Sequence, residues 1–306
     1  MNRIVLAHAA AAVAALSAGT VVVATRMVVS ETDPLSLVFY RYVVSVLCFV
    51  PFLPYIWPHK RLGAIEYVRI ALFGILFFVL FPWAFNASLQ YIPAARGAVG
   101  LATIPVQTLI VSAAFGREKL TASKIIGVAL AFLGVLVAFG TAAFSGGSSG
   151  YHVGDVLMLL GAFCAAIYSV FSRATLMRHG PLFVTALAMA FAVAALLPYA
   201  ALKQGFGTSD VFSYKGWIAV LFLGTVGGVM QFSLFMWALR WLPPTTTVLY
   251  LTLNPITAMV LGIMMLGESI TLELVAGMAL VLTGIVAGTG ALSLSKRWIR
   301  TGSTPG

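Results

Sequence analysis

The sequence has 306 residues, of which 61% are hydrophobic and only 8% are charged. Soluble domains carry about 25% charged residues, so this composition excludes a globule with a water-wetted surface and predicts an all-α polytopic membrane protein. The net charge of +10 does not indicate a nucleic-acid partner, because the basic residues stand mostly at the ends of apolar runs, where they act as topology signals.

Apolar runs of about 20 residues, the length that crosses a bilayer as a helix, recur along the chain. The first resembles a signal peptide, but its apolar part is longer than a signal core, and we interpret it as a retained first span. The segment at 145–152 is rich in Gly and Ser and is predicted to be a flexible linker. The ten predicted spans are roughly 4–25, 35–56, 67–90, 94–116, 122–141, 154–175, 182–202, 215–239, 244–266 and 272–293.

The second half of the chain repeats the first half. Sliding residues 81–140 onto 231–290 superposes rare, structure-determining residues without a gap. The pairs are Pro93 and Pro243, Pro105 and Pro255, Glu118 and Glu268, Thr121 and Thr271, Gly127 and Gly277, Gly134 and Gly284, and Gly140 and Gly290. We therefore predict two five-helix repeats, residues 1–144 and 153–306. Because five is odd, the second repeat enters the membrane from the opposite face, and such inverted repeats are typical of secondary transporters.

Positive charge predicts the orientation of the spans. With the N-terminus in the cytoplasm, thirteen Lys and Arg residues fall in cytoplasmic segments and four in outer segments. Cytoplasmic loops carry the excess of such residues, so both termini are expected to face the cytoplasm.

The two mid-span prolines predict breaks in the fourth and ninth helices. Pro105 and Pro255 would free the carbonyls of Leu101 and Leu251 near the bilayer midplane. Bare backbone is tolerated at that depth where it is buried in protein or lines a wet cavity. A kink made purely for packing is the alternative for either proline alone, whereas the pair favours a central site.

Polar and aromatic side chains near these breaks are predicted to line a substrate cavity. Interhelical hydrogen bonding is the alternative for any single one of them. Carboxamides both donate and accept hydrogen bonds, so they suit amino and carboxyl groups alike. The candidate substrate-binding residues are Asn86, Gln90, Arg96, Thr103, Gln107, Tyr168, Gln231, Trp237, Tyr250 and Asn254.

The charged residues have separate expected roles. Arg41, early in the second span, is expected to extend to the outer interface, and attraction of an anionic group is its alternative role. Glu118 and Glu268 are expected to cap the helices that follow them, because each precedes a Thr by three residues. The acidic residues all lie at span ends or in loops, so the sequence offers no obvious proton-coupling acid.

The sequence lacks motifs that would indicate metal-dependent chemistry. It contains no HExxH motif, and Cys48 and Cys164 lack a metal-binding spacing. We therefore predict no enzymatic activity, no metal site and no cofactor.

The repeated motif resembles the EamA family of the drug/metabolite transporter superfamily. The residues that carry the resemblance are "IPVQTLIVSAAFGREKLT", "NPITAMVLGIMMLGESIT" and "DPLSLVFYRYVVS". The resemblance implies a ten-helix carrier in the bacterial inner membrane that exports amino acids or other small metabolites. It also implies a cavity built mainly from the first, third, fourth, sixth, eighth and ninth helices. One departure is "SAGT" in the first span, where many members have a tryptophan before the glycine.

These observations lead to three hypotheses of different kinds. The first is a secondary transporter that exports a small metabolite by alternating access between the two repeats. The second is a passive facilitator or channel of the same fold, and the third is a membrane enzyme or assembly protein. The expected partners are a small-molecule substrate and the lipid bilayer, and the sequence assigns neither the substrate nor the oligomeric state.

Overall fold

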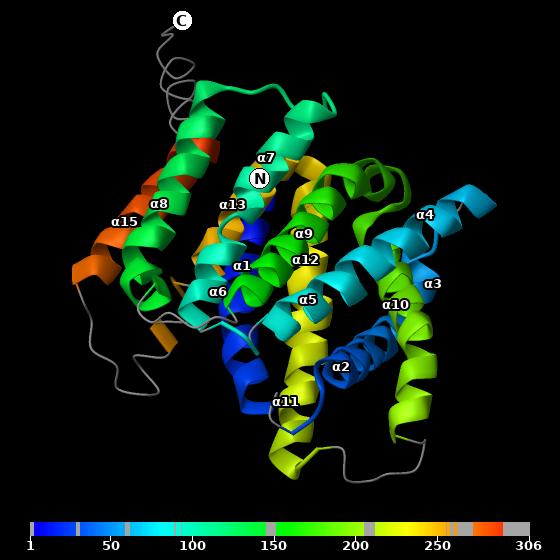
Figure 1. Cartoon of the computed structure of the whole chain (residues 1–306). Coiled ribbons are helices and arrows are strands. Elements are labelled where there is room, and N and C mark those ends of the chain that lie inside the picture. The colour runs from blue at the N-terminus through cyan, green and yellow to red at the C-terminus, as the bar shows by residue number, and fades with distance from the viewer. Residues whose placement is uncertain are drawn as a thin grey trace, which may run out of the picture.

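The computed structural model describes residues 3–28, 31–58, 62–88, 90–92, 94–144, 151–204, 212–254, 256–257, 260–261 and 272–289. Every regular element in these ranges is helical, which confirms the predicted all-α class (Figure 1). The α-helices are α1 (Arg3–Val28), α2 (Pro34–Phe49), α3 (Leu53–Ile56), α4 (Ala64–Ile75), α5 (Phe81–Ser88), α6 (Ala94–Leu101), α7 (Ile104–Ala114), α8 (Ala122–Phe144), α9 (Tyr151–His179), α10 (Pro181–Gln204), α11 (Tyr214–Gly224), α12 (Gln231–Trp241), α13 (Pro244–Leu249) and α15 (Leu272–Thr289). Four tighter or wider turns join some of them, the 3-10 turns η1 (Val50–Phe52) and η4 (Tyr250–Thr252) and the π-helical turns η2 (Leu76–Leu80) and η3 (Thr225–Met230).

Local sequence signals set several helix ends. Asp33 caps α2, since its Oδ1 accepts hydrogen bonds from the backbone N–H groups of Leu35 and Ser36 at 3.1 and 3.2 Å. Gly180 has a φ of 87° and reverses the chain between α9 and α10. The helix α9 begins at Tyr151, so the last two residues of the predicted linker are helical.

Six helical stretches are long and apolar enough to cross a membrane, and they match the first, second, third, sixth, seventh and eighth predicted spans. Shorter apolar helices at Val99–Ala114, Ala122–Ala138 and Val275–Gly288 match the fourth, fifth and tenth. The predicted ninth span is described only in part. The chain is therefore a multi-pass membrane protein, and the count of ten spans stays a prediction.

The sequence repeat also appears in the helix geometry. Shifted by the 150 residues of the repeat, the π turn η2 falls on the π turn η3. The fourth predicted span is interrupted between α6 and α7, and at the equivalent place in the second half α13 gives way to η4. Pi-helical turns are uncommon and concentrate at functional sites, so their recurrence in both halves points to the region between them.

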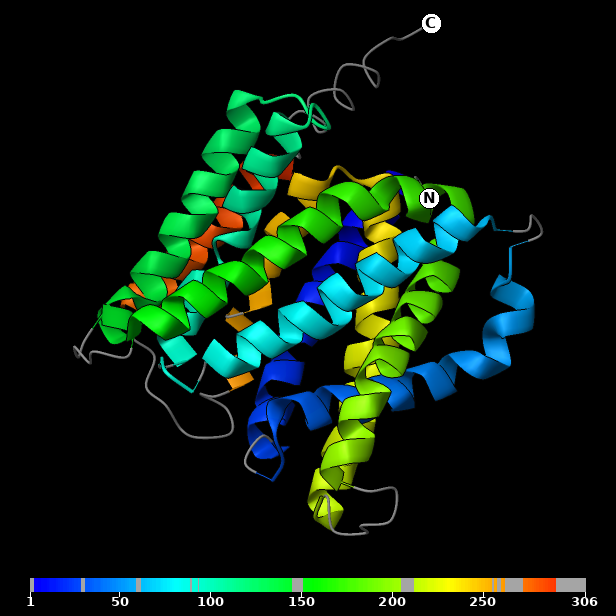
Figure 2. The same ribbon diagram turned by 45° about the vertical axis from the view of Figure 1, so that its right-hand side comes forward.

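A glycine contact joins α8 to α15, which lie side by side in both ribbon views (Figures 1 and 2). A Cβ atom added at Gly134 would lie 2.7 Å from the carbonyl oxygen of Gly277. A Cβ atom added at Gly284 would lie 2.7 Å from the carbonyl oxygen of Gly127. The two backbones therefore approach closely because these four positions carry no side chain.

In each half, the second predicted span packs closely against the third predicted span of the other half. In α11, a Cβ atom on Gly224 would lie 2.9 Å from the carbonyl oxygen of Arg41 in α2. In α4, a Cβ atom on Gly74 would lie 3.1 Å from the carbonyl carbon of Ala188 in α10. Gly74 and Gly224 are 150 residues apart, so the same crossing is built twice from exchanged helices.

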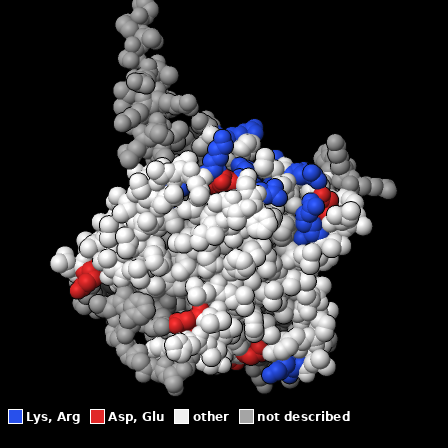
Figure 3. Space-filling view, turned by 45° about the horizontal axis from the view of Figure 1, so that its top comes forward, with Lys and Arg blue, Asp and Glu red and all other residues white. Residues whose placement is uncertain are grey.

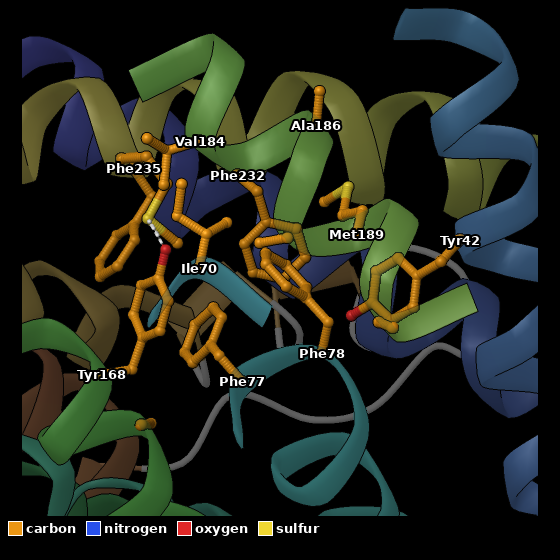
Figure 4. Close-up of a cluster of buried hydrophobic side chains, with 14 of the residues drawn as sticks. Tyr42, Ile70, Phe77, Phe78, Tyr168, Val184, Ala186, Met189, Phe232 and Phe235 are labelled. Carbon is orange, nitrogen blue, oxygen red and sulfur yellow. Dashed lines mark hydrogen bonds between the residues drawn. The ribbon is translucent and has the colours of Figure 1, made fainter. Parts of the chain in front are cut away.

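An aromatic cluster fills the space between the two crossings (Figure 4). Phe77 and Phe78 come from η2, and Phe232 follows η3. The rings of Phe78 and Phe232 meet edge to face with centroids 5.1 Å apart, an arrangement that aromatic quadrupoles favour.

Candidate functional site

The break in the fourth predicted span places two candidate residues together. Thr103 lies between α6 and α7, and its hydroxyl donates to the carbonyl oxygen of Gly100 at 2.6 Å. Gln107, one turn into α7, donates from Nε2 to Thr103 Oγ1 at 3.1 Å and to the carbonyl oxygen of Leu159 in α9 at 3.5 Å. Pro105 is buried in the first turn of α7, where a proline needs no N–H partner. The helix is interrupted directly before Pro105, and the polar side chains at the interruption form a connected group.

The equivalent break in the second half contains Tyr250 and Asn254. Tyr250 lies in η4, and its hydroxyl is 3.0 Å from Nδ1 of His8 in α1. Both Tyr250 and Asn254 are half-buried. The second predicted helix-break residue, Pro255, lies outside the described residues. The sequence analysis did not select His8, because nothing in its spacing points to the ninth span.

The two breaks pack against each other. Ala102 and Leu109 of the first half share one apolar cluster with Leu249, Leu253 and Ile256 of the second half. The cluster also includes residues of α1, α8 and α15. Segments about 150 residues apart in the chain therefore meet where both helices are interrupted, as a site at the interface of two repeats requires.

Three candidate residues have a buried carboxamide oxygen with no hydrogen-bond donor in the described part of the chain. They are Gln107, Gln231 and Asn254. A buried acceptor without a donor costs about 1–3 kcal/mol, and such atoms call for an explanation such as a water or ligand contact. These oxygens are suited to accept hydrogen bonds from an N–H or O–H group of a bound molecule.

The remaining candidates are placed differently. Tyr168 is fully buried in the aromatic cluster, stacked on Phe77 with ring centroids 4.3 Å apart (Figure 4). Its hydroxyl donates to the sulfur of Met236 at 3.2 Å. Trp237 and Tyr250 both pack against a small apolar cluster that contains alanines of α1. Asn86 is half-buried in α5 and Gln90 is exposed beyond it, whereas the side chain of Arg96 lies outside the described side chains.

Arg41 turns into the protein and contacts the second half. Its Nη2 donates to the carbonyl oxygen of Gly227 in η3 at 3.0 Å, and its guanidinium lies 5.7 Å from the ring centre of Phe232. One turn further, Ser45 Oγ donates to the carbonyl oxygen of Gly224 at 2.9 Å. The helix α2 thus supplies two donors to the backbone around the π turn, so Arg41 does not extend to the interface as the sequence suggested.

Glu118 also differs from its expected role. Its Oε1 accepts from the backbone N–H of Thr245 in α13 at 2.9 Å, so the carboxylate caps a helix of the other half and not the following helix α8. Glu268, its counterpart in the repeat, lies outside the described residues. The short-range signal, a Thr three residues later, gave no information about this long-range partner.

The chain matches known transporters along most of its length. The sequence profile of the EamA-like transporter family matches residues 5–140 and again residues 152–288. The uncharacterized inner membrane transporter YedA of Escherichia coli K12 is 27% identical over 252 residues, which cover 80% of this chain and 78% of YedA. An uncharacterized transporter of Archaeoglobus fulgidus is 28% identical over 218 residues, with 71% and 74% of the two chains covered.

Two further similarities bear on substrate and fold. A protein of Streptantibioticus cattleyicolor named "Probable terminal-alkyne amino-acid exporter" is 27% identical over 248 residues, which cover 81% of this chain and 80% of that protein. One crystal structure superposes with a TM-score of 0.76 at 20% identity and covers 92% of this chain and 98% of that one. This last similarity supports the fold alone.

Proposed function

Because the chain belongs to the EamA-like transporter family, and is a membrane transporter of that type, we propose that it is a secondary transporter that exports a small metabolite by alternating access. The observation that carries the proposal is the meeting of the two interrupted helices beside buried carboxamide oxygens without donors. We propose an amino acid or a related compound as the substrate, since carboxamides can bind both its amino and its carboxyl group. The similarity to a protein named as an amino-acid exporter supports this class.

The proposed architecture is ten spans in two inverted five-helix repeats, residues 1–144 and 153–306, with both termini in the cytoplasm of a bacterium. The crossed packing of the halves and the recurrent π turns support the repeat. Lys and Arg side chains gather over the upper end of the molecule and are few at the lower end (Figure 3). Because cytoplasmic segments carry the excess of Lys and Arg, this asymmetry supports the proposal that the upper end in this view faces the cytoplasm.

A resistance screen tests the function and the site together. Cells that express the protein are challenged with toxic levels of amino acids and their analogues. We expect specific protection by the wild-type protein and its loss in Gln107→Ala and Asn254→Ala, because each removes a buried acceptor from a break. Thr225→Ala is a control, since its exposed hydroxyl bonds only to backbone carbonyls of α11. Protection that survives in both site variants contradicts the proposed site.

A passive facilitator of the same fold is the alternative mechanism. The described acidic side chains lie at or near the ends of helices and none lies at a break, which favours this alternative over a carrier with a proton acceptor at the breaks. Counterflow in proteoliposomes separates the two mechanisms. A carrier accelerates the uptake of labelled substrate when unlabelled substrate is present on the opposite side, and a pore does not.

A further inference from the structure

The turn that follows α7 buries a carboxylate between the two halves of the molecule. The Glu118 side chain is only 5% exposed, and its Oε2 forms an ion pair with Nζ of Lys124 in α8. Its Oε1 accepts from the N–H of Thr245 at 2.9 Å and lies 3.5 Å from the Ser112 hydroxyl. A carboxylate at the first turn of a helix is favoured by the N–H groups exposed there and by the helix dipole. The contact therefore fixes the start of α13 to the end of the fourth predicted span.

The helix held in this way leads directly into the second break. All six residues of α13 are buried, with Thr245 at 1% and Thr247 at 0% exposure. Tyr250 directly follows α13 and Asn254 lies about one turn further, and both are half-buried. In the proposed topology α13 starts at the cytoplasmic face, so this structure is closed on the cytoplasmic side of the site. A displacement of the first turn of α13 would be transmitted to the break.

Other polar contacts between the halves are formed at both ends of the molecule at once. Glu66 of α4 pairs with Arg178 of α9 at 2.8 Å at the same end as Glu118. At the opposite end, the Glu31 carboxylate accepts from the N–H of Ser213 at 2.8 Å. Because these two contacts are formed at both membrane faces in the same conformation, they do not show which face is closed. The Glu118 contact differs from them because it holds the interrupted helix itself.

We propose that Glu118 is a positioning residue that closes the cytoplasmic end of the transport path and that its bond to Thr245 must break for that end to open. This inference rests on the proposed function, because it assumes that access to the site alternates. The carboxylate acts through α13 and does not touch the substrate.

Thiol labelling of the full-length protein in oriented membrane vesicles tests the proposal without a known substrate. The reporters are Thr246→Cys in α13, where Thr246 is 5% exposed, and Asn86→Cys near the C-terminal end of α5, on the outer side in the proposed topology. Both are made in a protein in which Cys48 and Cys164 are replaced by Ala. In Glu118→Ala we expect a membrane-impermeant reagent to label the reporter at position 246 from the cytoplasmic side at least about tenfold faster, the ratio expected on losing a hydrogen bond to a charged group. We expect slower labelling of the reporter at position 86 from the opposite side, because the outward-accessible population falls.

Two further variants separate positioning from general loosening. Glu118→Asp keeps the charge and is expected to restore slow labelling in part. Glu118→Gln keeps the size and an acceptor, and its labelling rate is expected to lie between those of the wild-type protein and Glu118→Ala. It takes the place of Glu118→Ala if that variant does not accumulate. Glu66→Gln makes the same charge change at the same face and is expected to leave both reporters unchanged. Unchanged labelling in the Glu118 variants overturns the inference, and so does faster labelling at both reporters. Resistance conferred by the wild-type protein, together with unchanged labelling in the variants, would contradict the inference and leave the proposed function standing. Altered labelling in a protein that transports nothing would contradict the proposed function, and the inference with it.

Discussion

The two crossings between the halves share a backbone arrangement and differ in one side chain. At both, a glycine of the third predicted span or its repeat equivalent lets the second span of the other half approach, Gly74 beside α10 and Gly224 beside α2. The α2 crossing carries Arg41 at this contact, and the α10 crossing carries Ala188. Duplication therefore preserved the requirement for close backbones, which only a missing side chain can meet, while the polar contacts of the two halves diverged.

A bulky side chain at Gly74, in the crossing of α4 with α10, is expected to have the largest effect on stability. Gly74→Leu would insert a side chain where a Cβ alone lies 3.1 Å from the Ala188 carbonyl carbon, and the backbone cannot move aside as a flexible side chain can. We expect a loss of about 3 kcal/mol or more, at or above the usual range for overpacking. Heating followed by size-exclusion chromatography in detergent measures the loss of folded protein.

Gly63→Leu is the matched control for this substitution, because nothing lies within 4 Å of a Cβ at Gly63. Similar amounts of folded protein from the two variants after heating would show that the crossing is not tightly packed.

Removing the arginine from the other crossing is expected to have the next largest effect. Arg41→Met keeps much of the apolar stem but leaves the Gly227 carbonyl without its donor, at a cost of about 2 kcal/mol. The thermal midpoint in detergent should fall accordingly. Arg69→Met is the control. The Arg69 side chain is exposed, and exposed ion pairs such as the one it forms with Glu66 contribute about 0–1 kcal/mol to stability. Equal midpoints for the two variants would mean that Arg41 does not stabilise the π turn.

The smallest expected effect concerns the aromatic cluster between the crossings. Tyr168→Phe keeps the stacking on Phe77 and loses only the bond to the Met236 sulfur, so we expect a stability change of less than about 1 kcal/mol and unchanged protection in the resistance screen. Loss of protection with unchanged stability would instead show that the hydroxyl binds substrate.

Much of the fold could be predicted from the sequence because its signals are local or repeat at a fixed interval. Apolar runs predicted the spans, and the pairs of glycines and prolines 150 residues apart predicted the repeat. Pro105 stands where the fourth predicted span is interrupted. Spacing within a helix shows which residues share a face, but not which helix lies opposite. The partner of Glu118 is 127 residues away, and the acceptor of Arg41 is 186 residues away. For the same reason the sequence could not show that Tyr168 stacks on Phe77 and donates to the Met236 sulfur.

The glycine contact between α8 and α15 has the reciprocity of a homodimer interface. Gly127 meets Gly284 while Gly134 meets Gly277, so each position touches the repeat equivalent of the other. This is the isologous pattern that two identical subunits form across a two-fold axis. One polypeptide therefore contains a contact that two separate copies of a single repeat could make, and the linkage at 145–152 turns the association of two subunits into an intramolecular event.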